Sequence, residues 1–169
     1  GAADVSAELM GRVLNPPGLI GMIAKYHDGI SRRDAPIFGV AAGLGAMSAL
    51  CSGRYTTQMP DGESSTNLYI LALGETGGGK EGIRKSVKDV LAAAQKKDHT
   101  INFASPQALY RALAARRCAL WMPDEFGRYL AAAAKPNGGQ DFMVNTAVMK
   151  LFGLALSSTK AVKYAKKTD

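Results

Sequence analysis

Large apolar residues recur at helical spacing in the first third of the chain. Four of them between positions 19 and 26 follow Pro16-Pro17-Gly18, and they predict a helix that begins near these three residues. A second helix is predicted from about Pro36 to Leu50, where many small residues would let another helix approach closely. We interpret residues 1–65 as a helical lead-in to a larger core.

From residue 66 onward, apolar runs typical of strands alternate with segments of helical spacing. Asn67–Leu73 is the best predicted strand, because it is apolar, rich in strand formers and stopped by a glycine. The other predicted elements are a short strand over 54–58, a helix over 82–95, a short strand over 101–103, a helix over 106–115, a strand over 117–122 and helices over 126–134 and 141–156. This alternation predicts an α/β fold with a parallel sheet flanked by helices.

The best predicted strand runs into a glycine-rich loop that matches a phosphate-binding motif. The loop has the G-x-x-x-x-G-K pattern of a P-loop and reads Gly74, Glu75, Thr76, Gly77, Gly78, Gly79 and Lys80. Glycines let backbone N–H groups face a phosphate chain, and the following helix points its positive end at the same anion. Lys80 would contact the β- and γ-phosphates, so the loop predicts ATP binding. The alternative is a flexible turn between a strand and a helix.

One position departs from the motif. A Ser or Thr is expected after the lysine to place a hydroxyl on Mg²⁺, but Glu81 stands there. A carboxylate is itself a hard oxygen ligand and could bind Mg²⁺ directly. It also adds negative charge beside the phosphates, which lowers affinity for them. Nucleotide binding is therefore expected more strongly than efficient hydrolysis.

A second acidic element follows the predicted strand over 117–122. Asp124 and Glu125 come directly after its apolar residues, 44 and 45 positions beyond Lys80. Carboxyl ends of parallel strands are where α/β sheets bind ligands. We therefore assign Asp124 to Mg²⁺ and Glu125 to the general base that polarises the attacking water. The alternative is a helix N-cap followed by a favourable carboxylate in the first turn.

Other residues of catalytic type lack partners at the spacing that a metal or nucleophile site needs. His27 is predicted on a helix surface and His99 in a loop, and Cys51 and Cys118 are isolated cysteines. Arg128 is either a phosphate sensor or a contact to a neighbouring subunit, or it is a solvated helix arginine, and the last interpretation is favoured.

The net charge of +7 bears on the kind of partner that the chain binds. A basic excess favours a polyanion, nucleic acid above all, although a solvated basic surface explains it equally well. No apolar run reaches the roughly 18 residues that a membrane span needs, and no signal peptide is visible. Two isolated cysteines agree with a reducing compartment, so we expect a cytoplasmic protein without a membrane partner.

The order of these motifs resembles a known family. The features are the Pro16-Pro17-Gly18 lead-in, the segment 66–69 that runs into the loop, the segment 105–109, and Asp124-Glu125-Phe126-Gly127. Together they are similar to the P-loop ATPase region of primase-helicase-like proteins encoded by phages and mobile elements, which is often described as a domain of unknown function. The similarity covers most of the chain from about Asn15 to Leu156.

The resemblance implies ATP-driven, helicase-like work on DNA during phage or mobile-element replication, in the cytoplasm of the host cell and as a homo-oligomeric ring. It implies a RecA/AAA-like P-loop NTPase core over residues 66–169, with Lys80 on the phosphates, Asp124 on Mg²⁺ and Glu125 as the catalytic acid. The departure at Glu81 puts hydrolysis in question. Little of the chain remains for the later strands, so we expect the C-terminal part of the sheet to be missing.

Two other functions fit the same motifs. A DNA-packaging motor of the terminase type uses the same loop and the same acidic strand. A degenerate P-loop module would bind nucleotide, or nothing, and act in assembly or regulation without turnover. Glu81 and the short C-terminal region favour this last class.

Overall fold

The computed structural model describes residues 6–60, 62–75, 78–116, 118–124, 126–134 and 139–153. The chain divides into two compact units. The first unit comprises residues 1–50 and 68–97, and the second comprises residues 51–67 and 98–169.

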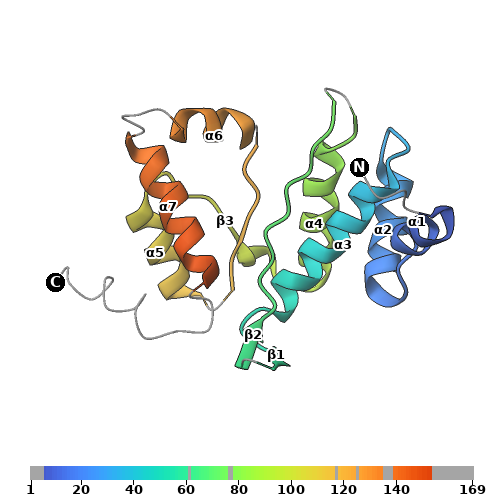
Figure 1. The fold of residues 1–169 in the computed structure, drawn as a ribbon, viewed down its shortest axis with the longest axis horizontal. Coiled ribbons are helices and arrows are strands. Elements are labelled where there is room, and N and C mark those ends of the chain that lie inside the picture. Colours follow the sequence, from blue (N-terminus) through green and yellow to red (C-terminus); the bar gives the residue numbers. More distant parts are fainter. Residues whose placement is uncertain are drawn as a thin grey trace. The chain divides into compact units, whose positions relative to one another are not determined.

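The first unit is helical (Figure 1). Its helices are α1 (Ala7–Leu14), α2 (Gly18–Ile30), α3 (Pro36–Cys51) and α4 (Glu81–Ala93). Helix α1 begins at Ser6, whose Oγ accepts a hydrogen bond from the backbone N–H of Leu9 at 3.2 Å. Helices α2 and α4 pack against each other, and α2 also packs closely against α3. The helices predicted after Pro17 and from Pro36 are therefore confirmed.

Small residues allow the close packing of α2 and α3. A Cβ at Gly39 would lie 2.8 Å from the carbonyl oxygen of Ala24, and one at Gly43 would lie 2.8 Å from that of Ile20. Side chains that fill the core of this unit come from α2, α3 and α4: Ile23, Ala24, Phe38, Val40, Ala42, Ala46, Ala49, Val87 and Leu91. The alanine- and glycine-rich sequence of α3 thus has the packing role that its composition predicted.

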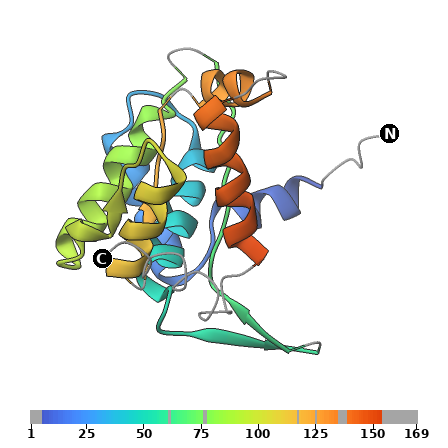
Figure 2. The ribbon, with the colours of Figure 1, turned by 90° about the vertical axis from the view of Figure 1, so that its left-hand side faces the viewer.

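The second unit contains the strands of the described chain. Its elements are β1 (Thr56–Met59), β2 (Gly62–Ser65), a 3₁₀ turn η1 (Lys97–His99), β3 (Thr100–Ile101), α5 (Pro106–Ala115), β4 (Leu120–Trp121), α6 (Phe126–Ala133) and α7 (Gly139–Gly153). Strands β1 and β2 form an antiparallel hairpin, and β3 and β4 pair in parallel with Ile101 opposite Trp121. Helix α7 packs against α5 and α6 (Figure 2).

The core of the second unit joins its parallel strands to two helices. Ile101, Leu109 and Ala147 are buried together, and Phe103 and Trp121 pack against them. The rings of Phe103 and Trp121 lie 4.7 Å apart between centroids, and Trp121 also contacts the rings of α6 edge-on. Trp121 is therefore part of the packing around this core.

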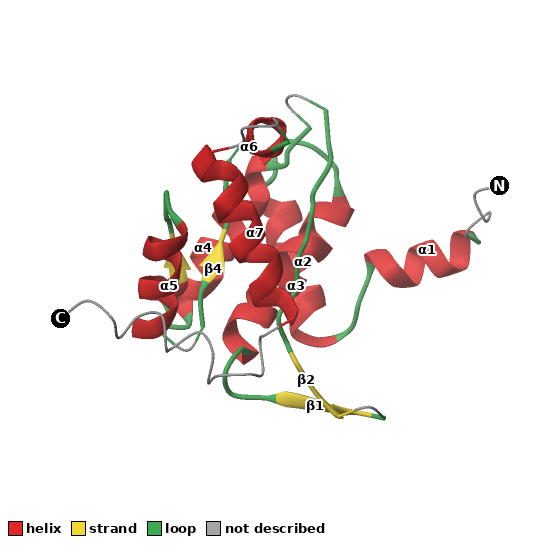
Figure 3. Cartoon of the chain, turned by 60° about the vertical axis from the view of Figure 1, so that its left-hand side comes forward, coloured by secondary structure: helices red, strands yellow, loops and turns green. Residues whose placement is uncertain are grey.

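The predicted fold class is wrong. The described residues form seven helices and two sheets of two strands each, one of them antiparallel, in place of the extended parallel sheet of a P-loop NTPase. The main difference lies at Asn67–Leu73, which is loop rather than strand (Figure 3). Its large side chains are exposed, up to 78 % for Leu73. Strand propensity alone does not form a strand, because a strand needs a neighbour to accept and donate its backbone hydrogen bonds.

Candidate functional site

The glycine loop ends in two tight backbone turns. The N–H of Gly78 donates to the carbonyl of Glu75 at 3.0 Å, and a Cβ at Gly78 would meet that same oxygen at 3.0 Å. Gly79 has φ +89°, a conformation that side chains rarely adopt. At the start of the loop, a Cβ at Gly74 would lie 2.9 Å from the ring of Phe38. Gly79 is therefore required by its backbone conformation, and a side chain at Gly74 or Gly78 would force its neighbours to shift. Thr76 and Gly77 lie outside the described residues.

The loop leads without interruption into the N-terminus of α4. Lys80 is the N-cap residue and already has helical backbone angles, and Glu81 is the first helical residue. The N–H of Gly82 donates to the carbonyl of Gly79 at 2.9 Å, which closes the first turn. The side chains of Lys80 and Glu81 are both exposed. A cation and a carboxylate thus stand next to each other at the positive end of a helix.

Two residues that the sequence did not single out lie against this loop. A Cβ at Gly79 would lie 3.3 Å from Ser31 Oγ and 3.4 Å from Arg33 Cβ. Ser31 Oγ donates to the carbonyl of Arg33 at 2.8 Å and so folds the connection between α2 and α3. This places an arginine beside the glycine loop. The sequence showed Arg33 only as part of a basic pair, because 46 positions separate it from Gly79.

His27 is buried beneath the first turns of α4, and its prediction as a surface residue is wrong. The side chain is 0 % exposed, and its Nδ1 lies 3.0 Å from Ser86 Oγ. Its Nε2 has no hydrogen-bond partner among the described residues. A Cβ at Gly82 would come within 2.9 Å of the imidazole Cε1. Because Gly82 has no side chain, the imidazole of His27 fits against α4. This packing of α2 against α4 fixes the helix that follows the loop.

A surface cluster further along α4 ties this helix to α2. Tyr26 Oη and Lys85 Nζ each donate to Asp89 Oδ2 at 2.7 Å. Hydrogen bonds from Lys85 and then Tyr26 lower the pKa of Asp89 below its usual value. The same bonds to Asp89 raise the pKa of Lys85 and of Tyr26. The contact adds a pH-dependent link between the two helices.

The acidic element lies in the other unit. Asp124 is exposed on a bend that follows β4, and Glu125 lies outside the described residues. The first unit therefore holds Gly74, Glu75, Gly78, Gly79, Lys80 and Glu81, whereas the second unit holds Asp124. Within the described residues, no group of three or more His, Cys, Asp or Glu side chains is arranged to hold a metal ion. The assignment of Mg²⁺ to Asp124 and Glu81 stays a prediction.

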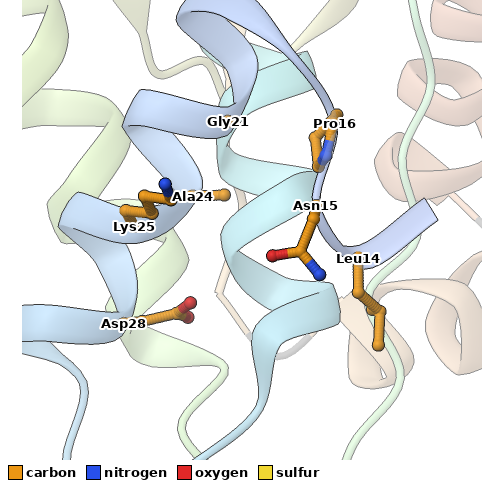
Figure 4. Close-up of a pocket in the computed structure, with 7 residues that line it drawn as sticks. All are labelled: Leu14, Asn15, Pro16, Gly21, Ala24, Lys25 and Asp28. Carbon is orange, nitrogen blue, oxygen red and sulfur yellow. The ribbon is translucent and has the colours of Figure 1, made fainter. Parts of the chain in front are cut away.

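A small hollow in the first unit is separate from the glycine loop (Figure 4). It has a volume of about 90 Å³ and is lined by residues of α2 and of the chain before it, including Asn15, Lys25 and Asp28. Pockets that enclose a ligand of nucleotide size measure roughly 300–1,000 Å³. This hollow is therefore not the nucleotide site.

No family model matches the sequence, and comparison with curated proteins and with solved structures gave no match. None of the helices in the described part of the chain combines the length and the apolar character that a membrane crossing needs. The features that bear on function are thus the chemistry of the loop and of its neighbours.

Proposed function

We propose that this chain binds ATP through its phosphate chain at the glycine loop before α4, with Lys80 as the cation that contacts the β- and γ-phosphates. The observation that carries the proposal is the positive φ of Gly79 directly before the N-terminus of α4. In such an arrangement, backbone N–H groups and the helix dipole converge on one anion. A phosphate-binding site of this kind needs only the loop and the helix end, and both belong to the first unit.

Arg33 supports the same proposal independently. Its Cβ lies 3.4 Å from the position of a Cβ at Gly79, so Arg33 adds a positive charge beside the loop. A guanidinium presents a planar fork of donors that suits phosphate oxygens. Arg33 would then assist Lys80 in holding the phosphates.

Binding is proposed as the primary property, with turnover slow. Glu81 places a carboxylate at the position where P-loop enzymes use a hydroxyl, and repulsion from the phosphates lowers affinity. The lack of an extended parallel sheet among the described residues also favours a nucleotide-binding module over a conventional motor. Assembly or regulation controlled by nucleotide is the role that fits these features.

A nucleic-acid motor is the second candidate. Strands β3 and β4 are parallel and joined through α5, and Asp124 follows β4 as the metal-holding acid of such motors follows its strand. The net charge of +7 suits a DNA partner. Helicase-like and packaging motors share these features, and a ring of identical chains would be the active form of either.

Titration with a fluorescent ATP analogue tests the binding proposal. We expect Lys80→Ala to weaken binding at least about tenfold, equivalent to about 1.4 kcal/mol. Lys88→Ala is the matched control, because Lys88 is an exposed lysine of the same helix, two turns beyond the loop. Lys88→Ala should change the dissociation constant of the ATP analogue by less than about twofold. Equal loss in both variants, or no binding by the native chain, would overturn the proposal.

Hydrolysis assays separate the candidates. ATP turnover that single-stranded DNA stimulates and that Lys80→Ala abolishes would establish the motor. Strand displacement on a forked DNA would then distinguish a helicase from a packaging enzyme. Nucleotide binding with no stimulated turnover would instead leave the binding module as the function.

A further inference from the structure

Segment 68–73 of the first unit is an apolar stretch of chain that lies at the surface. Its large side chains are all exposed, namely Leu68, Tyr69, Ile70, Leu71 and Leu73. Among the residues that the structure describes, none makes a backbone hydrogen bond with residues 70–73. Open N–H and C=O groups on an apolar segment are a template for pairing with another strand.

The exposure of these side chains alternates along the segment, as it does along a strand with one covered face. Exposure is 55 % at Tyr69, 58 % at Leu71 and 78 % at Leu73. It is lower at Ile70, at 45 %, whose Cδ1 lies 3.8 Å from the position of a Cβ at Gly45 in α3. The segment runs along α3 (Figure 1, Figure 3). A period of two is that of an extended chain, so one face of the segment lies on its own helix and the other faces outward.

We infer that segment 68–73 pairs antiparallel with the same segment of a second copy of this chain. The net charge of +7 opposes contact between two copies over most of their surface. This segment is the exception, because no charged residue lies between Glu63 and Glu75. Antiparallel pairing of a segment with itself follows a two-fold axis, so the assembly closes at two copies.

The sequence of the segment is complementary to itself in this arrangement. A pair centred on Ile70 places residues 67–73 of one copy opposite residues 73–67 of the other. Each Tyr69 then lies opposite a Leu71, and such cross-strand pairs of large side chains stabilise antiparallel sheets. Each Leu68 lies opposite the small Ala72, so bulky residues do not collide. The backbone groups of residues 70–73 gain the partners that they lack within one chain.

The exposed area of the segment is that of a small specific interface. Its five large side chains present on the order of 500 Å² on each copy, so two copies reach the roughly 1,000 Å² that a specific interface needs. A ribbon of two strands is marginal by itself. We therefore expect a reversible dimer that forms at micromolar concentration. Lys80 lies outside the paired residues, so the pairing does not depend on the proposed nucleotide site.

Analytical ultracentrifugation of the full chain at increasing concentration tests the pairing. We expect Leu71→Lys to weaken dimerisation at least about tenfold, because the two-fold axis buries the unpaired charge twice. Met22→Lys is the matched control, since Met22 is an exposed residue of α2 and the change adds the same charge. It should alter dimerisation by less than about twofold. Lys80→Ala should leave dimerisation unchanged, which separates this inference from the nucleotide proposal.

Amide hydrogen exchange shows whether this segment is the contact. Protection of residues 69–73 should rise with concentration in the native chain and stay constant in Leu71→Lys. A chain that stays monomeric, or that forms assemblies larger than two copies, would overturn the inference. So would a dimer whose exchange at residues 69–73 does not change with concentration, or one that both lysine variants weaken equally. If circular dichroism shows that Leu71→Lys does not fold, the exchange of the native chain still decides.

Discussion

Lys80 and Glu81 stand next to each other where the glycine loop meets α4, with opposite effects on a bound phosphate. The lysine attracts the anion, and the carboxylate repels it while favouring the helix N-terminus. Sequence reasoning identified this conflict, because it depends on neighbours in the chain. It did not identify Arg33 or His27, since both reach the loop region only through the packing of α2 against α4.

Replacement of Glu81 measures the effect of its carboxylate on nucleotide binding and on the stability of α4. We expect Glu81→Ser to tighten binding of ATP with Mg²⁺ by about three- to tenfold, because a repulsive charge leaves and a hydroxyl is gained. The same change should lower the free energy of unfolding by about 0.3–1 kcal/mol through the loss of a favourable first-turn carboxylate. Calorimetric titration and urea unfolding give the two values. Weaker binding by the serine variant would mean that Glu81 is itself a metal ligand.

Asp89 makes the stability of the first unit depend on pH. Its pKa is lowered in the folded chain, from an ordinary value of 3.8, by hydrogen bonds from Lys85 and then Tyr26. A lowered folded pKa stabilises the fold above the unfolded pKa, and this contribution is lost as pH falls through the folded value. We expect Asp89→Asn to be less stable than the native chain at pH 7, and the difference to be smaller at pH 3, below the ordinary pKa of 3.8 and nearer to the lowered folded pKa. Urea unfolding at both pH values tests this, and a gap that is undiminished in acid would contradict it.

At the scale of elements, six of the seven described helices were predicted, all except α1, and the extended sheet was predicted wrongly. Helix signals are local: Ser105 directly precedes the helix predicted over 106–115, and its Oγ accepts a hydrogen bond from the N–H of Ala108 at 3.1 Å. The segment 67–73 carries an equally clear strand pattern, yet it is loop. A strand is completed by a partner distant in sequence, and local preference contains no information on that partner.

The contact of α2 with α3 can be tested at two glycines of one helix. A Cβ at Gly43 would lie 2.8 Å from a backbone oxygen of α2, whereas one at Gly45 would meet its nearest atom, Ile70 Cδ1, at 3.8 Å. Gly43→Ala should therefore cost about 1–3 kcal/mol through overpacking. Gly45→Ala should gain up to about 1 kcal/mol, because alanine is the better helix former. Thermal and urea unfolding compare the two, and similar effects would show that the helices do not pack this closely.

On the scale of the whole molecule, the charge is the clearest property that sequence predicts without a fold. Lysine and arginine exceed acidic residues by seven, and they are spread over both units and the C-terminal segment. Such an excess describes either a surface for a polyanion or an ordinary solvated basic surface. Composition cannot separate these alternatives, because both have the same net charge and differ only in whether phosphates displace counterions on binding.

The salt dependence of DNA binding separates them. Each phosphate that a cation neutralises on single-stranded DNA contributes about −0.7 to the slope of log affinity against log salt. Three such contacts would weaken binding about 20-fold between 50 and 200 mM salt. We expect at least this loss in fluorescence anisotropy titrations with a labelled oligo(dT). Binding that salt does not affect, or no binding at 50 mM, would mean that the basic surface is solvated, and the nucleotide-binding module would then remain without a nucleic-acid partner.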